Sequence, residues 1–320
     1  MNKIVVTGGA GFLGSRLIGT LLSQQGKSSM PAFDQIVSVD LAECPVKDSR
    51  VQSLTGDIAD PEFARKVITK GTVAVYHMAA VLSGQSEAEF DVGMRVNVDG
   101  TRALLEAARQ TGEKPFFIYT SSLAVFGGAM PDVVPEDLAL MPQSSYGAEK
   151  AIGELLVCEY SRKGFVDGRV CRLPTIVVRP GKPNSAASSF ASGIIREPLS
   201  GIKSNNPVPP ETLMWLSSPN AVVKNLAHTL EVSGEKLGLK RVLNLPGLCV
   251  SVAEMLASLE RVAGPEVRAL VSEEPEQRVI DIVCSWPGDF DVIRPLSLGF
   301  TRDSDFDSII RQYRDEFVTK

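Results

Sequence analysis

The sequence has few of the residues that build metal and disulfide sites. It contains five cysteines and two histidines in 320 residues. The cysteines show no C-x-x-C pair and no spacing typical of metal ligands. An odd number of widely separated cysteines is typical of reduced thiols in the cytosol rather than of a disulfide framework. We therefore expect a cytoplasmic protein with no metal and with cysteines that only pack; they are Cys44, Cys158, Cys171, Cys249 and Cys284.

The chain also lacks a strong charge of one sign and a long apolar run. It carries 33 basic and 38 acidic residues, for a net charge of -5, and the two signs are mixed along the sequence. This balance argues against nucleic acid and anionic membranes as partners. No apolar stretch approaches the ~20 residues of a membrane span, and the first residues lack the features of a signal peptide. We expect the N-terminus to form a strand instead.

Short apolar runs alternate with segments of helical periodicity over the first half of the chain. Runs that are apolar at nearly every position predict strands buried on both faces, and hence a parallel sheet covered by helices. The predicted strands are 4–7, 36–40, 51–57, 73–80, 115–122, 169–178 and 242–245, and the clearest helices are 96–110, 144–163, 218–231, 250–263 and 306–317. The fold class is therefore α/β, a Rossmann-type doubly wound parallel sheet with a smaller C-terminal α/β substrate lobe.

A change in amino-acid composition after residue 178 predicts two domains. Residues 180–193 are rich in small and turn-forming residues, which predicts a loop that enters a helix. We expect a cofactor-binding domain at 1–178, with returning segments near 214–247. The expected substrate-binding lobe comprises residues 179–213 and 248–320.

A glycine-rich turn after the first strand predicts a dinucleotide site. Gly8, Gly11 and Gly14 follow the strand and open the first helix. Glycine permits the tight turn and the close approach of a pyrophosphate to backbone N–H groups, here including those of Phe12 and Leu13. The alternative is a merely flexible turn.

An acidic residue at the end of the second strand indicates which nicotinamide cofactor binds. The Asp40 carboxylate can accept hydrogen bonds from both hydroxyls of the adenine ribose, and it would repel a 2′-phosphate. No arginine stands directly beside Asp40 to hold such a phosphate. The sequence therefore favours NAD over NADP, with Asp57 and Ile58 as candidate contacts to the adenine. Asp60, followed by Pro61, is also a candidate helix start.

A tyrosine and a lysine four residues apart, Tyr146 and Lys150, provide candidate acid/base chemistry. One helical turn separates them, so the phenol and the ammonium group can lie side by side. A nearby cation lowers the pKa of a phenol and makes it a usable general base. By itself this spacing is more often a half-buried ring beside a solvated lysine stem. The glycine turn upstream makes the catalytic interpretation the stronger one.

Seven motifs in order make the chain resemble the extended short-chain dehydrogenase/reductase family, the superfamily of NAD-dependent epimerases and dehydratases. The motif residues run 7–14, 56–58, 77–80, 97–101, 120–127, 146–150 and 172–174. The resemblance implies that Ser122 binds the reacting oxygen, that Tyr146 is the acid/base, and that Lys150 binds the nicotinamide ribose. It also implies that Ala79, Asn97 and Pro174 lie along the cofactor, and that His77 supports the core rather than catalysis.

One departure from the family pattern concerns the substrate. Many sugar epimerases have an aromatic-Gly-Pro stretch after the sixth strand, whereas residues 175–189 here are mostly small. Arg179, Arg196, Ser83 and Gln85 are candidates to bind the carboxylate or hydroxyls of a small hydroxy acid, with plain surface polarity as the alternative. Residues 81–90, 172–189 and 193–201 resemble family members that oxidise the C2 hydroxyl of D-erythronate.

Other functions compatible with the same residues stay open. A nucleotide-sugar epimerase or dehydratase would use the same triad and recycle its NAD internally. A non-catalytic NAD-binding sensor is disfavoured because serine, tyrosine and lysine are all present. L-Threonate and other short aldonates are alternative substrates. The resemblance also implies a homodimer built on helices 96–110 and 144–163.

Overall fold

The computed structural model describes residues 1–27, 29–181 and 188–318. The described chain forms two compact units. The first comprises Met1–Val125, Pro142–Arg172 and Val223–Leu243, and the second Phe126–Met141, Leu173–Val222 and Asn244–Lys320. Part of the predicted loop at 180–193, residues 182–187, lies outside the described residues.

The first unit is built on a seven-stranded sheet with the order β10-β6-β5-β4-β1-β2-β3. Neighbouring strands pair in parallel from β5 through β4, β1 and β2 to β3. The strands are β1 (Lys3–Thr7), β2 (Gln35–Asp40), β3 (Val51–Thr55), β4 (Thr72–His77), β5 (Phe116–Ser122), β6 (Asp167–Leu173) and β10 (Val242–Asn244). This confirms the predicted doubly wound sheet.

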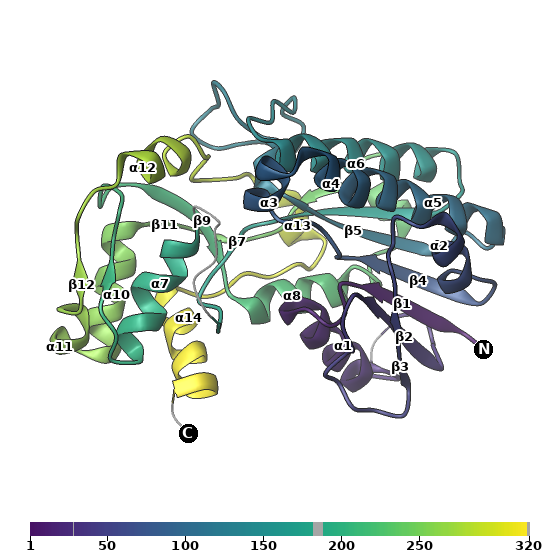
Figure 1. The fold of residues 1–320 in the computed structure, drawn as a ribbon, viewed down its shortest axis with the longest axis horizontal. Coiled ribbons are helices and arrows are strands. Elements are labelled where there is room, and N and C mark those ends of the chain that lie inside the picture. The colour runs from purple at the N-terminus through teal and green to yellow at the C-terminus, as the bar shows by residue number, and fades with distance from the viewer. Residues whose placement is uncertain (28, 182–187, 319–320) are drawn as a thin grey trace. The chain divides into compact units, whose positions relative to one another are not determined.

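Helices cover both faces of this sheet, with α1 on one face and α5 and α6 on the other (Figure 1). The helices are α1 (Phe12–Gln24), α2 (Pro61–Val67), α3 (Ser83–Ala88), α4 (Phe90–Gly93), α5 (Gly100–Thr111), α6 (Ser145–Arg162) and α9 (Gly234–Leu237). A π-helical stretch, Met94–Asp99, precedes α5, and a 3-10 turn, Leu123–Val125, follows β5. Asp60 does cap α2, accepting a hydrogen bond from the Glu62 N–H.

The helices are held on the sheet by a continuous apolar core. Val5, Val75 and Phe117 from the strands are buried together with Leu104 and Leu105 from α5. Strands that are apolar on both faces can be stable only when both faces are covered, so the sequence pattern and the observed layers have the same cause.

The second unit contains two small sheets and its own core. Its sheets have the orders β11-β9-β7 and β12-β8. The strands are β7 (Thr175–Ile176), β8 (Ser204–Asn205), β9 (Leu213–Ser217), β11 (Leu248–Ser251) and β12 (Val271–Ser272). The helices are α7 (Ser189–Leu199), α10 (Val252–Ala263), α11 (Pro265–Arg268), α12 (Gln277–Val283), α13 (Ile293–Ser297) and α14 (Phe306–Tyr313), followed by a π-helical Arg314–Val318.

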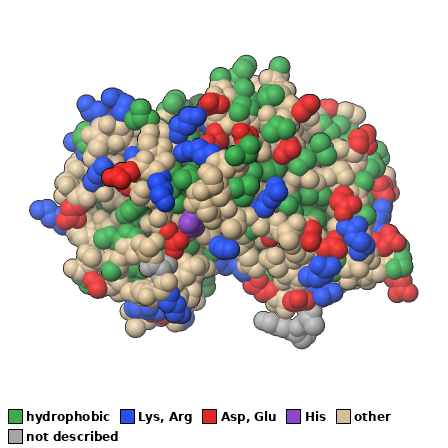
Figure 2. Space-filling view, turned by 180° about the vertical axis from the view of Figure 1, so that it is seen from behind, with side chains coloured by type: hydrophobic (Ala, Val, Ile, Leu, Met, Phe, Trp, Pro, Cys, Tyr) green, Lys and Arg blue, Asp and Glu red, His purple; other side chains and the backbone are tan. Residues whose placement is uncertain are grey.

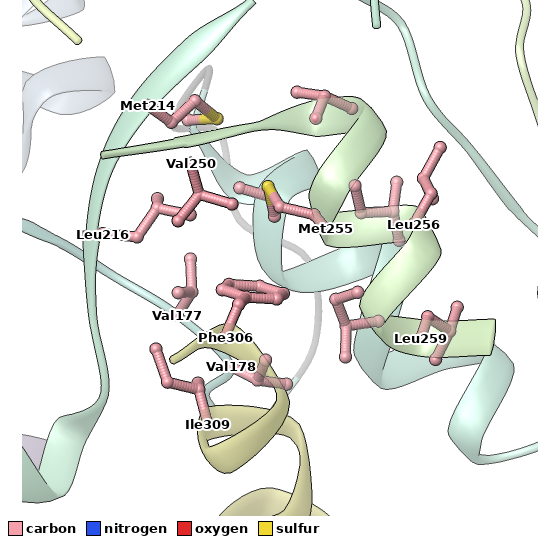
Figure 3. Close-up of a cluster of buried hydrophobic side chains, with 14 of the residues drawn as sticks. Val177, Val178, Met214, Leu216, Val250, Met255, Leu256, Leu259, Phe306 and Ile309 are labelled. Atoms are coloured by element: carbon pink, nitrogen blue, oxygen red, sulfur yellow. The ribbon is translucent and has the colours of Figure 1, made fainter. Parts of the chain in front are cut away.

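Figure 3 shows how this second core is assembled. Leu216 from β9 and Val250 from β11 point toward Met255 on α10 and Phe306 on α14. All four side chains are at most 7% exposed. Helix α8 (Pro219–His228) joins the second unit to the last part of the first.

Several predicted elements differ in extent from the observed ones, and two of these differences are informative. The predicted strand at 169–178 ends at Leu173, because Pro174 cannot donate a ladder hydrogen bond, and the chain then forms β7, which pairs with β9 in the other sheet. The predicted helix at 250–263 begins only at Val252. Residues Leu248–Ser251 pair antiparallel with β9 as β11.

The distribution of charged side chains on the surface agrees with the mixed charges along the sequence. Acidic and basic side chains are interspersed over the face in Figure 2. None of the helices within 1–27, 29–181 and 188–318 is long and apolar enough to cross a membrane. All five cysteines are free thiols, but Cys249 and Cys284 are exposed, so the expectation that the cysteines only pack does not hold for these two.

Candidate active site

The glycine turn forms a close-packed cradle at the carboxyl end of β1. Gly8 has a φ of +74°, and a Cβ there would lie 2.9 Å from the Ala79 backbone nitrogen. A Cβ on Gly14 would lie 2.1 Å from the Gly8 carbonyl oxygen. These two positions admit only glycine, since no side chain can yield when the contact is backbone.

The first turn of α1 is open toward this cradle. Gly11 is the N-cap residue and provides no side-chain cap, so the N–H groups that begin with Phe12 and Leu13 are available to an anion. Sequence-predicted Gly8, Gly11, Phe12 and Leu13 thus lie together in one turn. Their arrangement fits a dinucleotide pyrophosphate.

The Asp40 carboxylate lies at the end of β2, beside the same turn. It accepts hydrogen bonds from the Ala10 N–H (3.0 Å) and the Leu41 N–H (2.7 Å). The two bonds fix the carboxylate and leave lone pairs on both oxygens for further donors. This geometry fits a pair of ribose hydroxyls.

Asp57 and Ile58 follow β3 rather than end it, since the strand stops at Thr55. Asp57 accepts a hydrogen bond from the Ala59 N–H and forms an ion pair with Arg95. Its pKa is lowered: burial opposes ionisation, but the Arg95 hydrogen bond and the Ala59 N–H outweigh it. Ile58 is 5% exposed and belongs to the core.

Ser122, Tyr146 and Lys150 converge where β5 ends and α6 begins. Lys150 is 2% exposed and its Nζ donates to the Thr120 carbonyl at 2.8 Å. The same nitrogen lies 5.6 Å from the centre of the Tyr146 ring. The Ser122 side chain is close enough to the Tyr146 phenol to lower its pKa. Serine, phenol and ammonium groups therefore stand in one cluster.

Glycines bring α6 close to β5 and set the position of this cluster. Ser144 caps the helix by accepting from the Gly147 N–H at 3.1 Å. A Cβ on Gly147 would lie 2.1 Å from the Ala124 carbonyl oxygen, and one on Gly153 would lie 2.3 Å from the Tyr119 hydroxyl oxygen. Because the helix sits this close, Tyr146 and Lys150 reach the end of the strand.

Burial sets the ionisation of the cluster more strongly than the sequence indicated. Burial raises the pKa of the Tyr146 phenol to about 12, the Glu149 charge raises it further, and the Ser122 hydrogen bond opposes the rise. Burial lowers the pKa of Lys150 to about 8. In the chain alone the pKa of Tyr146 is therefore raised by desolvation. The effect of Lys150 on this pKa stays a prediction.

His77 is enclosed in the sheet. Its ring nitrogens lie 2.9 Å from the hydroxyl oxygens of Thr7 and Thr101. Burial, with the charge on Lys150, lowers the pKa of the imidazole to about 3. A neutral ring with both nitrogens engaged fits a supporting role.

The remaining first-unit candidates lie on the stretch after β4. The Ala79 N–H donates to the Thr7 hydroxyl at 3.2 Å. Asn97 is 2% exposed and lies in the π-helical stretch. Ser83 is half-buried at the start of α3, whereas Gln85 is exposed and donates to Glu89.

The other three candidates belong to the second unit. Pro174 is buried between β6 and β7. Arg196 is 6% exposed, forms an ion pair with Glu197, and donates to the Arg179 carbonyl at 3.0 Å. The Arg179 guanidinium is half-buried and has no hydrogen bond or ion pair within 1–27, 29–181 and 188–318. Burial, followed by repulsion from Arg196, lowers its pKa.

The sequence interpretation missed two buried carboxylates on α6. Glu149 hydrogen-bonds Asn97, and Glu154 forms a buried ion pair with Arg172 while accepting from Ser121 at 2.6 Å. Charged residues on helices are usually solvated, so no local pattern marks these two as buried. The nearest signal is their position within one turn of Lys150.

Comparisons with known proteins agree with this fold and with the family that the motifs indicate. The 3-beta hydroxysteroid dehydrogenase/isomerase family matches residues 5–185. The chain is 54% identical to D-erythronate dehydrogenase of Cupriavidus necator, with 98% of each chain covered. It is 44% identical to D-erythronate dehydrogenase of Haemophilus influenzae, with 97% of this chain and 98% of the relative covered.

A solved structure described as a nucleoside-diphosphate-sugar epimerase from Agrobacterium tumefaciens superposes with a TM-score of 0.94 at 37% identity. The match covers 99% of this chain and 94% of that one. Family match, near full-length relatives and fold thus agree with the motifs. The chain belongs to the 3-beta hydroxysteroid dehydrogenase/isomerase family, within the extended short-chain dehydrogenase/reductase superfamily that its motifs indicate.

Proposed function

We propose that the protein is an NAD-dependent dehydrogenase that oxidises the C2 hydroxyl of D-erythronate to 2-dehydro-D-erythronate. The observation that carries the proposal is the cluster of Ser122, Tyr146 and buried Lys150 in a chain that is 54% identical to a D-erythronate dehydrogenase over nearly its whole length. The cluster supports the reaction type, and the relatives support the substrate.

The first unit would hold NAD. Backbone N–H groups of the glycine turn would bind the pyrophosphate, and Asp40 would accept the adenine ribose hydroxyls. When bound, NAD supplies the hydride acceptor and a positively charged ring. Asp57, Ile58, Ala79, Asn97 and Pro174 are the further proposed contacts along the cofactor.

Three side chains would carry the proton chemistry. Tyr146 takes the proton from the C2 hydroxyl, and Ser122 donates a hydrogen bond to the oxygen as it becomes a carbonyl. Lys150, held by the Thr120 carbonyl, binds the nicotinamide ribose and adds the positive charge that favours the phenolate. Because burial raises the pKa of Tyr146, this charge is needed to bring the phenol into a working range.

Arg179 and Arg196 are the proposed ligands of the substrate carboxylate. Of the two candidate arginines, Arg196 is already committed to Glu197 and to the Arg179 carbonyl. Arg179 is the better ligand, because its half-buried guanidinium has no acceptor in the described part of the chain. Arg196 then places Arg179. As a separate proposal, Ser83 contacts a substrate hydroxyl.

Replacing Arg179 by alanine is expected to raise KM for D-erythronate about tenfold or more while kcat changes less. An arginine-carboxylate hydrogen bond is worth roughly 1.5–3 kcal/mol, and each 1.4 kcal/mol is tenfold in affinity. Steady-state kinetics measures the change. Arg278→Ala, on exposed α12, is the control and should leave KM unaltered. A KM within threefold of wild type for Arg179→Ala would remove it from the site.

Assembly and location are part of the same proposal. We propose a homodimer in which α5 and α6 of two copies pair, supported by Leu155 on α6, which is 67% exposed. Light scattering at working concentration tests this, and a monomeric mass would reject it. We place the reaction in the cytoplasm, a setting that suits five free thiols.

The decisive assay follows NADH formation with purified protein, NAD and a panel of D-erythronate, L-threonate and nucleotide sugars. Stoichiometric NADH with D-erythronate supports the proposal, and preference for L-threonate would replace the substrate but keep the reaction. Conversion of a nucleotide sugar without net NADH would make the protein an epimerase or dehydratase.

A further inference from the structure

Glu149 is a fully buried carboxylate within the Tyr146–Lys150 turn of α6. Its side chain is 0% exposed, yet within the described residues it forms no ion pair with a cationic side chain. An unpaired buried carboxylate is costly, so its neighbours must compensate with hydrogen bonds.

Two buried donors supply that compensation, both at one oxygen. The Oε2 atom accepts from the Asn97 amide at 2.6 Å and from the Ser86 hydroxyl at 3.0 Å. The donors come from the π-helical stretch and from α3. Glu149 Oε2 thus connects α6 to the π-helical stretch and to α3.

The second oxygen packs against backbone. Glu149 Oε1 has no hydrogen-bond partner among the described residues, and a Cβ on Gly93 would lie only 2.2 Å from it. The end of α4 therefore approaches the carboxylate as closely as a glycine permits. The Glu149 carboxylate is thus buried with only one of its two oxygens hydrogen-bonded, and the packing around it holds it in place. Buried polar groups of this kind often have a functional role.

The connection continues from Asn97 to the stretch after β4. The Asn97 side chain accepts from the Val81 N–H at 2.8 Å and donates to the Val81 carbonyl at 3.0 Å. Both backbone groups of Val81 are thereby fixed. Val81 lies between Ala79 and Ser83, the proposed contacts to cofactor and substrate. A π-helical stretch such as the one that holds Asn97 is frequent at functional sites.

We propose that Glu149 is a positioning residue: through Asn97 and Ser86 it locks the 79–83 stretch to the helix that carries Tyr146 and Lys150. The inference rests on the proposed function for its substrate, but the positioning of the NAD-binding stretch is independent of which hydroxy acid is oxidised. The 79–83 stretch and the acid/base cluster are then held in a fixed position relative to each other.

The charge of Glu149 has a second, separable effect. Tyr146 is faced by Lys150 and Glu149 on its own helix and by Ser122 and Tyr119 on β5. Of these, Glu149 opposes formation of the phenolate. Removing the charge while keeping the hydrogen bonds should therefore ease ionisation of Tyr146.

The test compares Glu149→Ala with Glu149→Gln. Alanine removes the connection, so the Kd for NAD, measured by titration without substrate, and the KM for D-erythronate should each rise about tenfold or more. Glutamine can still accept from Asn97 and Ser86. We expect both constants within threefold of wild type and a kcat/KM that rises at lower pH than in wild type. Glu159→Ala, an exposed carboxylate on the same helix, should change neither constant.

The inference is overturned if folded Glu149→Ala binds NAD as wild type does, or if Glu149→Gln restores nothing that alanine loses. Should Glu149→Ala fail to fold, Ser86→Ala takes its place. It removes one of the two donors and should weaken NAD binding about threefold, with unchanged binding as the contrary result. A wild type that binds NAD but makes no NADH from D-erythronate would reject the proposed substrate and leave this positioning test intact.

Discussion

Tyr146→Phe is expected to lower kcat with D-erythronate by about 100-fold or more. General acid/base catalysis is worth roughly 10²–10⁴ in rate, and phenylalanine cannot take up the C2 proton. Phenylalanine retains the ring, so its packing beside Lys150 and the fold should persist. NADH formation under saturating substrate measures the effect.

The matched control is Tyr160→Phe, which removes a hydroxyl bonded to Glu106 further along α6. This variant should keep wild-type turnover, since its hydroxyl lies away from the cluster. More than a tenth of wild-type kcat in Tyr146→Phe would eliminate the tyrosine as the base. Thermal unfolding of both variants separates lost chemistry from lost structure.

Gly14→Ala is expected to weaken NAD binding about tenfold or more and to lower the free energy of unfolding by roughly 1–3 kcal/mol. The new Cβ would lie 2.1 Å from the Gly8 carbonyl oxygen, so the cofactor turn itself must move. Titration with NAD and chemical denaturation measure the two effects.

Gly19→Ala, on the same helix, is the control. Among the described residues, no atom outside the helix's own backbone lies within 4 Å of a Cβ at Gly19. Alanine should therefore stabilise the helix by about 0.5–1 kcal/mol and leave NAD binding unchanged. Equal NAD affinity in Gly14→Ala and wild type would show that the turn does not approach the cofactor.

The sheet of the first unit was predictable because its signals are local. Each strand is a short apolar run with a turn at its end, and the layers follow from the need to cover two apolar faces. The proline that ends β6, Pro174, can be read from the sequence. The strand with which β7 pairs cannot. It pairs with β9, some forty residues away, and such pairing depends on the assembled unit.

The candidate site was predictable in its residues and less so in its electrostatics. The spacing of Tyr146 and Lys150 placed them side by side, and the glycines marked the turn that we propose to bind the cofactor. The direction of the Tyr146 pKa depends on how deeply α6 is packed, which Gly147 and Gly153 decide through contacts distant in sequence. The burial of Glu149 depends in the same way on Asn97, which lies 52 residues earlier.

Deuterium at C2 tests most directly whether hydride passes from C2 of D-erythronate to NAD. With [2-²H]-D-erythronate we expect reduced cofactor that carries one deuterium, a slower turnover, and a 2-keto product free of the label. Unlabelled NADH with deuterium retained in the product would show that another carbon is oxidised and would contradict hydride transfer from C2.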